Sequence, residues 1–347
     1  MRVIVAAGTP GFIGGGATEL AISVERALIE AGHEVELLFV QSYEDTTRIF
    51  PQLAGMRVHD YSDEADHLIA LRWPAHFLRH ERKSVWFLHE YRTLFDLAGY
   101  LGDMGALQAG DAERARLLAR WEHTALSEAR NVFTNSQVVS DRLARSLDGF
   151  PAQVLEPPYP RELPEAPAFA AGRHVLQLGR VAPIKRQDLA IRALAASGAD
   201  WHLTIAGVPE PPEYGRALHE MVDELGVADN VDLRLGWIDE YEKLALLARS
   251  SVVLNLAFAE DSYSYVTYEG WAAARPVVTT SDTEGIAHAV ATAGAGAVAD
   301  PDPASLGRAV QDLLSDPVRA AAEGAMGRDW VLTKSTSWGD AIARLLS

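Results

Sequence analysis

The chain alternates between short apolar runs and amphipathic segments, and this alternation predicts its elements. In the first half, an apolar run at residues 3–7 is followed by helical periodicity over residues 17–32 and a second apolar run at residues 35–40. Further strand-like runs lie at residues 67–72, 84–90 and 131–136, and helical patterns at residues 108–130 and 137–147. Apolar runs without polar alternation are typical of parallel strands that helices cover on both faces. We therefore predict a parallel α/β sheet for this half.

The second half repeats this pattern after a proline-rich break. Residues 156–172 hold five prolines in seventeen positions and no apolar periodicity, which is typical of a linker. Beyond it, apolar runs at residues 174–180, 201–207, 252–257 and 276–280 alternate with helical segments. We predict two doubly wound, Rossmann-like domains, residues 1–160 and 161–328, and a last helix in residues 329–347 that crosses back to the first domain. Open parallel sheets bind ligands at the carboxyl ends of their strands, so we expect the site there.

Composition narrows the classes of function. The 347 residues carry 31 Lys and Arg against 48 Asp and Glu, a formal net charge of -17 that opposes binding to nucleic acid and anionic membranes. The absence of cysteine excludes a disulfide scaffold, a thiolate nucleophile and a Cys-ligated metal site. No run of about 18 apolar residues occurs, and the opening residues lack the basic region of a signal peptide. We expect a cytoplasmic protein without stable membrane insertion.

A glycine-rich loop follows the first predicted strand. It runs from Gly8 to Gly16, includes Gly14 and Gly15, and opens a helix, so its N–H groups and the helix dipole are suited to holding a phosphate. The spacing is not that of the dinucleotide fingerprint, and no acidic residue closes the second strand in the usual ribose position. A glycine turn without a ligand is the alternative.

Two cations follow the first strand of the second half. Arg180 ends the strand, and Lys185 comes five residues later, just before a helix. In an acidic protein, this pair at the mouth of a sheet suggests a diphosphate site, because the Arg fork and the Lys point charge both bind phosphate oxygens. A solvated loop is the alternative.

Two acidic residues follow a later strand. Asp261 precedes Glu269 by eight residues, across a loop that leads into a helix. Carboxylates in this arrangement accept hydrogen bonds from sugar hydroxyls, while loop amides at the helix start face a phosphate or a hydroxyl. An acidic cap at the helix start, with a second Glu on the solvated face, is the alternative.

These motifs together resemble the retaining GT-B glycosyltransferases of family four. That family is marked by Gly-Arg with Lys five residues later and by two acidic residues eight apart, as at Arg180, Lys185, Asp261 and Glu269. Similarity extends over most of the chain, through GHEVEL, WFLHEYRTLFDLAGY, NVFTNSQVVSDRL, VLEPPYP, HLTIAG and ADPDPASLGRAVQDLLSDP. The resemblance implies a GT-B fold, in which two Rossmann-like domains face a central cleft, with the donor mainly on residues 165–325 and the acceptor mainly on residues 1–160.

The resemblance also implies a role for each motif residue. Arg180 and Lys185 resemble the clamp on the diphosphate of a nucleotide-sugar donor, Glu269 the residue that binds both ribose hydroxyls, and Asp261 the residue that holds the donor sugar. His89 resembles the histidine near the reacting carbon, although without the resemblance a buried structural histidine is the favoured interpretation. The remaining implied donor contacts are Gly14, Gly15 and Gly16 at the diphosphate, the amides of Tyr263, Ser264, Tyr265 and Val266 beside the sugar, and Gly207, Leu235 and Gly236 at the base.

Three positions depart from the family pattern. Asp261 is one methylene shorter than the usual Glu, and Ser264 and Ala274 stand where the family mostly has Gly. These departures bear on the donor sugar and leave open a non-catalytic nucleotide-sugar-binding paralogue. A nucleotide-sugar epimerase of the same fold is a second alternative.

The function implied is transfer of a sugar from a nucleotide diphosphate sugar, UDP rather than GDP, with retention at the anomeric carbon. No carboxylate is an obvious covalent nucleophile, so we expect front-face attack in which the leaving phosphate takes the acceptor proton. The acceptor is an unidentified small molecule or glycan that binds in loops such as residues 40–65 and 90–110. We expect no cofactor and no nucleic-acid partner, and a homodimer is a candidate assembly. His76, His80 and His89 lack the close helical pairing with carboxylates of a zinc site, so no catalytic metal is predicted.

Overall fold

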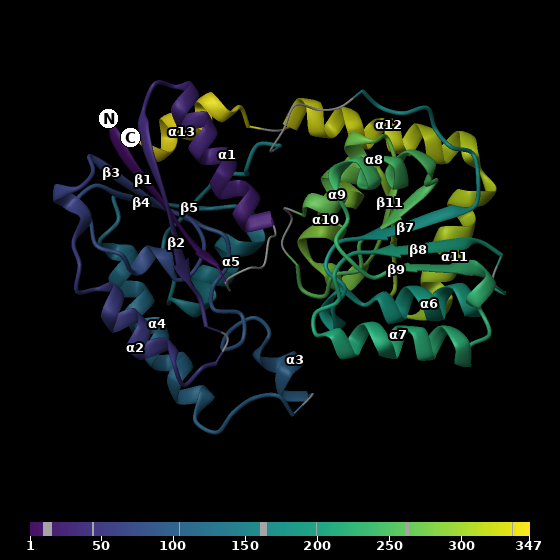
Figure 1. Ribbon diagram of the computed structural model, residues 1–347, viewed down its shortest axis with the longest axis horizontal. Coiled ribbons are helices and arrows are strands. Elements are labelled where there is room, and N and C mark those ends of the chain that lie inside the picture. Colours follow the sequence, from purple (N-terminus) through teal and green to yellow (C-terminus); the bar gives the residue numbers. More distant parts are fainter. Residues whose placement is uncertain are drawn as a thin grey trace. The chain divides into compact units, whose positions relative to one another are not determined.

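A computed structural model gives the arrangement of the chain in space (Figure 1). It describes residues 1–9, 16–43, 45–103, 105–159, 165–198, 200–260, 264–334 and 336–347. The contacts divide the chain into two compact units, Met1–Arg161 together with Ser335–Ser347, and Glu162–Lys334. Each unit is built on its own parallel sheet.

The first unit contains, within the described residues, a six-stranded parallel sheet of order β2-β1-β3-β4-β5-β6. Its strands are β1 (Arg2–Thr9), β2 (Glu34–Gln41), β3 (His67–Ala70), β4 (Lys83–Phe87), β5 (Asn131–Thr134) and β6 (Gln153–Val154). Its helices are α1 (Gly16–Glu30), α2 (Ile49–Met56), α3 (Ala98–Asp103), α4 (Asp111–Ser127), α5 (Gln137–Ser146) and α13 (Trp338–Leu345). The order changes direction at β1, so the carboxyl ends of β1 and β3 flank a topological switch point.

Apolar side chains from alternate strand positions cover the two faces of the first sheet. Val3 and Val5 pack with α1 and α13 on one face, and Ile4 and Ala6 pack with α4 and α5 on the other. This is the two-sided burial that the apolar runs predict, because neighbouring residues of a strand point to opposite faces. α13 completes the first core although it comes last in the chain, since its Ile342 and neighbouring side chains lie in the same cluster as Val3.

The second unit contains, within the described residues, a six-stranded parallel sheet of order β12-β11-β10-β7-β8-β9. Its strands are β7 (His174–Leu178), β8 (His202–Ala206), β9 (Val231–Arg234), β10 (Val252–Leu254), β11 (Val277–Thr280) and β12 (Gly296–Ala299). Its helices are α6 (Gln187–Ala196), α7 (Pro212–Glu224), α8 (Glu240–Arg249), α9 (Tyr265–Ala272), α10 (Gly285–Ala293), α11 (Pro303–Ser315) and α12 (Pro317–Lys334). Here the switch point lies at the adjacent strands β7 and β10.

Helices cover both faces of the second sheet as well. α6, α7 and α11 pack on the face that carries Val252 and Leu254 (Figure 1). α9 packs on the opposite face, where a Cβ added to Gly270 would lie 3.2 Å from Val277 Cγ2 and 3.3 Å from Val253 Cβ. The fold is therefore the doubly wound architecture predicted for both halves.

The last crossing comes later than predicted. We expected residues 329–347 to leave the second domain, but α12 continues as one helix to Lys334 and the returning segment is Ser335–Ser347. The reason is aromatic packing, because the Trp330 ring lies 5.7 Å from the Tyr268 ring and 5.4 Å from the Trp271 ring of α9. Aromatic contacts of this kind stabilise the helix on the second unit beyond their buried area.

Candidate active site

The loop after β7 places two cations at the switch point of the second sheet. Arg180 follows the strand directly, and Lys185 ends a short 3₁₀ turn, Pro183–Lys185. Two glutamines fix the loop, since Gln177 Nε2 donates to the Lys185 carbonyl at 2.8 Å and Gln187 Nε2 donates to the Arg180 carbonyl at 3.1 Å. One side chain of β7 and one of α6 thus hold the loop, and its backbone is fixed at both cations.

Arg186 ties the same loop to the neighbouring strand β10. Its backbone is left-handed, with φ of 53°. Its guanidinium donates to the Leu256 carbonyl at 2.6 Å, to Thr280 Oγ1 at 2.8 Å and to Asp282 at 2.7 and 2.9 Å. This fork geometry is the strong form of ion pair, and it keeps Lys185 beside the residues that follow β10.

Both cations of the predicted clamp are paired with glutamates. Arg180 Nη1 lies 3.0 Å from Glu210 Oε2, and the two side chains are 46% and 34% exposed. Lys185 Nζ donates to Glu260 Oε2. These pairs are partly open to solvent, so another anion can compete for the cations at little net cost.

Two glycines allow the ends of β7 and β8 to lie very close to each other. A Cβ on Gly207, whose φ is +151°, would lie 1.9 Å from the Gly179 carbonyl oxygen, closer than any side chain tolerates. On its other side Gly179 faces α9, where an added Cβ would meet Val266 Cγ2 at 3.5 Å. The structure therefore brings together Gly207, the start of the Arg180 loop and Val266.

Leu235 and Gly236 follow β9, the next strand along this edge. The Gly207 N–H donates to the Arg234 carbonyl at 3.1 Å, which places Gly207 beside the residue that precedes Leu235. Leu235 is partly buried, with its Cδ1 facing Gly215 of α7, and a Cβ added to Gly236 would meet nothing within 4 Å. The three residues predicted to face a base thus occupy neighbouring strand ends.

The N-terminus of α9 stands over the same edge. Ser264 is the cap residue and Tyr265 the first helical residue, and the first helical hydrogen bond runs from the Tyr268 N–H to the Ser264 carbonyl. Ser264 is extended, with φ of −123°, and its hydroxyl accepts from Asn255 Nδ2 at 2.6 Å. The side chain at this position, where the family mostly has Gly, therefore imposes no left-handed backbone strain.

Glu269 points from α9 to a lysine that the sequence analysis did not single out. Its Oε1 accepts from Lys243 Nζ of α8 at 2.5 Å, and the same ammonium contacts Glu240 Oε2 at 2.9 Å. Lys243 and Glu269 are each 19% exposed. Burial lowers the pKa of Lys243, but the carboxylates of Glu269 and Glu240 outweigh it and raise that pKa above its usual value.

The first unit supplies His89 and Gly16 at the carboxyl edge of its own sheet. His89 follows β4, and its Nδ1 donates to the Glu90 carbonyl at 2.7 Å while its Nε2 accepts from Arg72 Nε at 3.3 Å. These two bonds select the tautomer with the proton on Nδ1. Gly16 is the first residue of α1 and is exposed. The predicted residues Gly14, Gly15, Asp261 and Tyr263 lie outside the described residues.

A buried carboxyl lies next to His89. Glu90 is 5% exposed and accepts a hydrogen bond from the Ser146 hydroxyl. Burial raises its pKa to about 7, because the charged form loses hydration. Glu90 is thus protonated over much of the acidic range in the folded protein.

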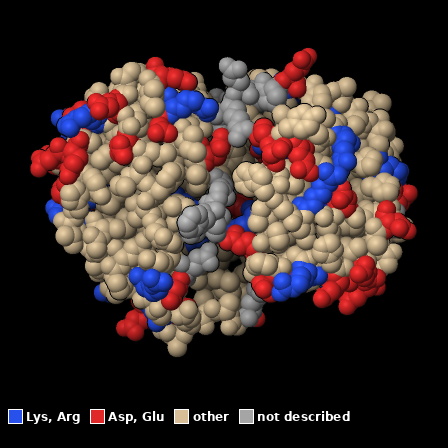
Figure 2. Space-filling model, viewed as in Figure 1, with Lys and Arg blue, Asp and Glu red and all other residues tan. Residues whose placement is uncertain are grey.

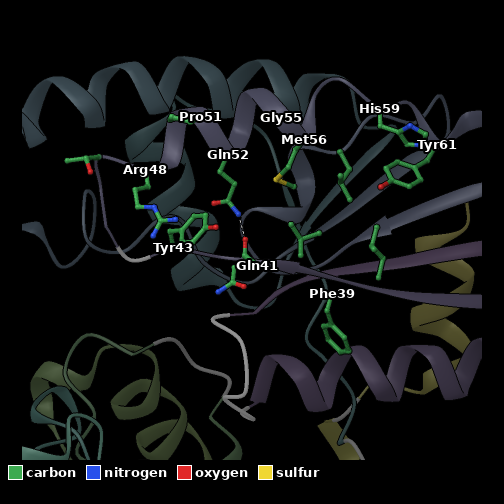
Figure 3. A pocket seen from close by; sticks show the side chains of 14 residues that line it. Phe39, Gln41, Tyr43, Arg48, Pro51, Gln52, Gly55, Met56, His59 and Tyr61 are labelled. Carbon is green, nitrogen blue, oxygen red and sulfur yellow. Dashed lines mark hydrogen bonds between the residues drawn. The ribbon is translucent and has the colours of Figure 1, made fainter.

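A surface groove of about 730 Å³ runs between the edge strand β2 and α2 (Figure 3). Leu38, Val40 and Leu78 contribute its apolar floor. At the carboxyl end of β2, the Arg48 guanidinium lies 4.0 Å from the centre of the Tyr43 ring. Figure 3 also shows the Gln52 side chain, which reaches from α2 to the Gln41 carbonyl. The groove lies within residues 40–65, one of the two loops where we predicted the acceptor, together with parts of β2 and Leu78.

Four site residues were missed by sequence reasoning, namely Glu210, Glu260, Lys243 and Arg186. Glu210, Glu260 and Lys243 meet their partners over 30, 75 and 26 positions of sequence, so no local pattern reveals the pairs. One signal was present for Lys243, because only four of the 31 basic residues are Lys. In a chain that uses Arg almost everywhere, Lys185 and Lys243 stand out.

Ala274 has a structural explanation that is separate from the site. It follows α9 with φ of 54°, its N–H donates to the Trp271 carbonyl at 2.8 Å, and the Arg275 N–H donates to the Gly270 carbonyl at 2.9 Å. This is the Schellman end of a helix, whose left-handed position favours Gly. The helix end forms with Ala all the same, at the cost of local strain.

Three further observations concern surface charge, hydropathy and metal ligands. Acidic and basic side chains lie interspersed over both units on the face that Figure 2 draws. Within the described residues, no helix is long and apolar enough to cross a membrane, and no cluster of three metal-ligating side chains is present.

Comparison with known proteins agrees with this geometry. Residues 172–316, which include the β7 to α11 region, match the family of glycosyl transferases group 1. A GDP-mannose-dependent alpha-(1-6)-phosphatidylinositol monomannoside mannosyltransferase of Mycolicibacterium smegmatis is 33% identical over 183 residues, 50% of this chain and 47% of that protein. A D-inositol 3-phosphate glycosyltransferase of Kineococcus radiotolerans is 28% identical over 280 residues, 72% of this chain and 62% of that protein. The chain therefore matches about half to three-fifths of these relatives.

Solved structures share the fold over the whole chain. The glycosyltransferase WaaG, of lipopolysaccharide biosynthesis, has a TM-score of 0.74 at 18% identity and covers 99% of both chains. HepE of Anabaena, solved with UDP and glucose, has a TM-score of 0.74 at 15% identity, covering 99% of this chain and 98% of its own. The chain therefore has the GT-B fold, and residues 172–316 of its second unit are similar to the family of glycosyl transferases group 1.

Proposed function

We propose that this protein transfers a sugar from a nucleotide diphosphate sugar to an acceptor hydroxyl. The observation that carries the proposal is the pair Arg180 and Lys185 at the switch point of the second sheet, with the N-terminus of α9 over the same edge. Arg180 and Lys185 bind the diphosphate in place of Glu210 and Glu260, and the α9 amides add partial positive charge. Neutralised phosphates make a better leaving group, which lowers the barrier to transfer.

The nucleoside lies along the ends of β8 and β9 in this proposal. Glu269 accepts hydrogen bonds from the ribose hydroxyls, and Gly207, Leu235 and Gly236 offer a main-chain surface to the base. We propose UDP ahead of GDP as the nucleotide. The solved relative from Anabaena supports UDP, whereas the mycobacterial relative is named for GDP-mannose. The donor sugar is assigned to Asp261 and the loop around it.

We propose retention at the anomeric carbon by front-face attack. The bond from C1 to the leaving phosphate oxygen breaks, the bond from C1 to the acceptor oxygen forms, and the leaving phosphate takes the acceptor proton. No metal ion takes part, because Arg180, Lys185 and the α9 amides supply the positive charge. His89, with its proton on Nδ1, is the proposed contribution of the first unit beside the reacting carbon.

The acceptor is proposed to bind in the groove between β2 and α2. Arg48 is exposed near the carboxyl end of β2, beside this groove, and its guanidinium lies over the Tyr43 ring. An acceptor with a phosphate or carboxylate group satisfies that cation, while its apolar atoms lie over Leu38 and Val40. The name of the Kineococcus relative, which acts on an inositol phosphate, supports an anionic acceptor.

The test is turnover with a panel of UDP-sugars and GDP-sugars, followed by mass spectrometry for hydrolysis and transfer. Arg180→Ala is expected to lower kcat by roughly a hundredfold or more, as loss of one charge-stabilising donor does. Arg216→Ala, which removes an exposed Arg of α7, is the matched control and leaves kcat unchanged. Wild-type turnover in Arg180→Ala contradicts the proposal. Nucleotide binding without hydrolysis or transfer indicates a non-catalytic paralogue, and solvent deuterium in the recovered sugar indicates an epimerase.

A further inference from the structure

The contact between Lys243 and Glu269 joins two helices that approach the proposed nucleoside from different strands. α8 begins after the loop from β9, where the base is proposed, and α9 begins after the loop from β10. Lys243 is in the first turn of α8, and its Nζ lies 2.5 Å from Glu269 Oε1. Lys243 thus links the first turn of α8 to the proposed ribose ligand.

The position of Lys243 is itself fixed by other bonds. The Asp239 carboxylate caps α8 by accepting from the Glu242 N–H at 2.8 Å. Arg234, the last residue of β9, donates to Glu242 Oε1 at 2.8 Å. The first turn of α8 is therefore hydrogen-bonded to the end of β9, next to Leu235 and Gly236. Because this turn is fixed, Lys243 can hold the Glu269 carboxylate in a defined position.

A carboxylate that binds ribose hydroxyls benefits from a cationic partner that fixes its position. A carboxylate that accepts from two vicinal hydroxyls must be ionised and must present its lone pairs outward. A Glu side chain on a helix surface otherwise samples many rotamers, and ordering it lowers the affinity for its ligand. An ammonium occupies one of about four acceptor directions of the carboxylate and leaves the others for hydroxyls. The other contact of Lys243, with Glu240, keeps the ammonium from turning away to solvent.

We propose that Lys243 is a positioning residue that orients the Glu269 carboxylate for the ribose hydroxyls, and so sets a preference for ribonucleotides over 2′-deoxyribonucleotides. The proposal rests on the proposed function, because it takes Glu269 as the ribose ligand. It predicts that the effect of Lys243 depends on the 2′-hydroxyl. A general electrostatic or structural role has no such dependence, because it acts equally on both nucleotides.

The experiment measures calorimetric affinities for UDP and 2′-deoxy-UDP, with GDP and 2′-deoxy-GDP in parallel, on the chain of 347 residues. Wild type is expected to prefer the ribonucleotide by roughly tenfold or more, the value of a hydrogen bond to a charged group. Lys243→Met keeps an unbranched apolar stem and removes the ammonium, and is expected to bring the ratio close to one. Lys243→Arg is expected to restore part of the ratio.

Glu240→Gln is the matched control, because it removes the charge of the second partner of Lys243, keeps an amide oxygen that can accept from the ammonium, and leaves the pair with Glu269 in place. It is expected to keep most of the wild-type ratio, and melting temperatures establish that each variant is folded. A ratio in Lys243→Met equal to that of wild type, or an equal loss for both nucleotides, overturns the inference and leaves the proposed function standing. Equal binding of both nucleotides by wild type overturns the ribose role of Glu269 and this inference with it. Failure of wild type to bind any of the four nucleotides overturns the proposed function as well.

Discussion

Gly207→Ala is expected to destabilise the second unit and to disturb the diphosphate site at once. The added Cβ would lie 1.9 Å from the Gly179 carbonyl oxygen and 2.7 Å from its carbon, whereas real Cβ contacts stay above 3.0 Å. One of the two strand ends must therefore move by about 1 Å, a backbone shift of the kind that overpacked sites require. The moving end is held, since the Gly179 N–H donates to the Ala206 carbonyl at 3.0 Å.

The expected cost is about 3 kcal/mol or more, from overpacking together with the φ of +151° that Ala rarely adopts. For a unit of this size, a loss of about 3 kcal/mol lowers the melting temperature by about 6–12 °C. Gly226→Ala is the matched control, because its φ is +66° but nothing lies within 4 Å of the added Cβ. This substitution should lower the free energy of unfolding by only about 1 kcal/mol, because it adds a side chain to a left-handed backbone without a clash.

The assay is calorimetric unfolding combined with amide hydrogen exchange, read separately on peptides from each unit. Gly207→Ala should weaken protection in β7 and β8 and leave β1 and β3 unchanged, and its affinity for UDP should fall because Arg180 follows Gly179. A melting temperature equal to that of Gly226→Ala would refute the close approach of Gly207 and Gly179.

Two further predictions follow from backbone strain and from burial. Ala274→Gly should raise the free energy of unfolding by about 0.5–1 kcal/mol, because the position has φ of 54° and ends α9. Urea denaturation measures this, and a loss of stability would contradict it. Glu90 carries a pKa of about 7 in the folded protein against 4.5 unfolded, so its contribution is fully present below pH 4.5 and is lost as pH rises through 7. Glu90→Gln should therefore flatten the decline in stability between about pH 4.5 and 7 by about 3 kcal/mol, and a slope equal to that of wild type would argue against a buried neutral carboxyl.

Much of the fold follows from local patterns in the sequence. Apolar runs such as residues 3–7 and 252–257 predicted strands because parallel strands are buried on both faces, and β1 and β10 lie there. The proline-rich segment predicted the change from one unit to the next. The end of α12 was missed because it depends on Trp330 packing against α9, a contact between distant segments.

In the candidate site, too, the residues that lie close together in the sequence were predicted, and the contacts between distant elements were not. The sequence predicted Arg180 and Lys185 at one strand end, since their spacing is local and parallel strands share their carboxyl edge. It did not predict that Glu210, Glu260 and Lys243 would pair with the charged residues of the site, because those partners come from other elements. It also did not predict the groove at β2, whose shape depends on how α2 lies against an edge strand.

Arg180 and Lys185 are proposed to bind the pyrophosphate of the donor. The most direct measurement compares the affinities of UDP and UMP for wild type and for the double variant Arg180→Gln with Lys185→Gln. Wild type should prefer UDP by roughly tenfold or more, because charge-assisted bonds to the second phosphate are strong. The double variant should bind the two nucleotides about equally, and a preference for UDP as large as that of wild type would contradict the account.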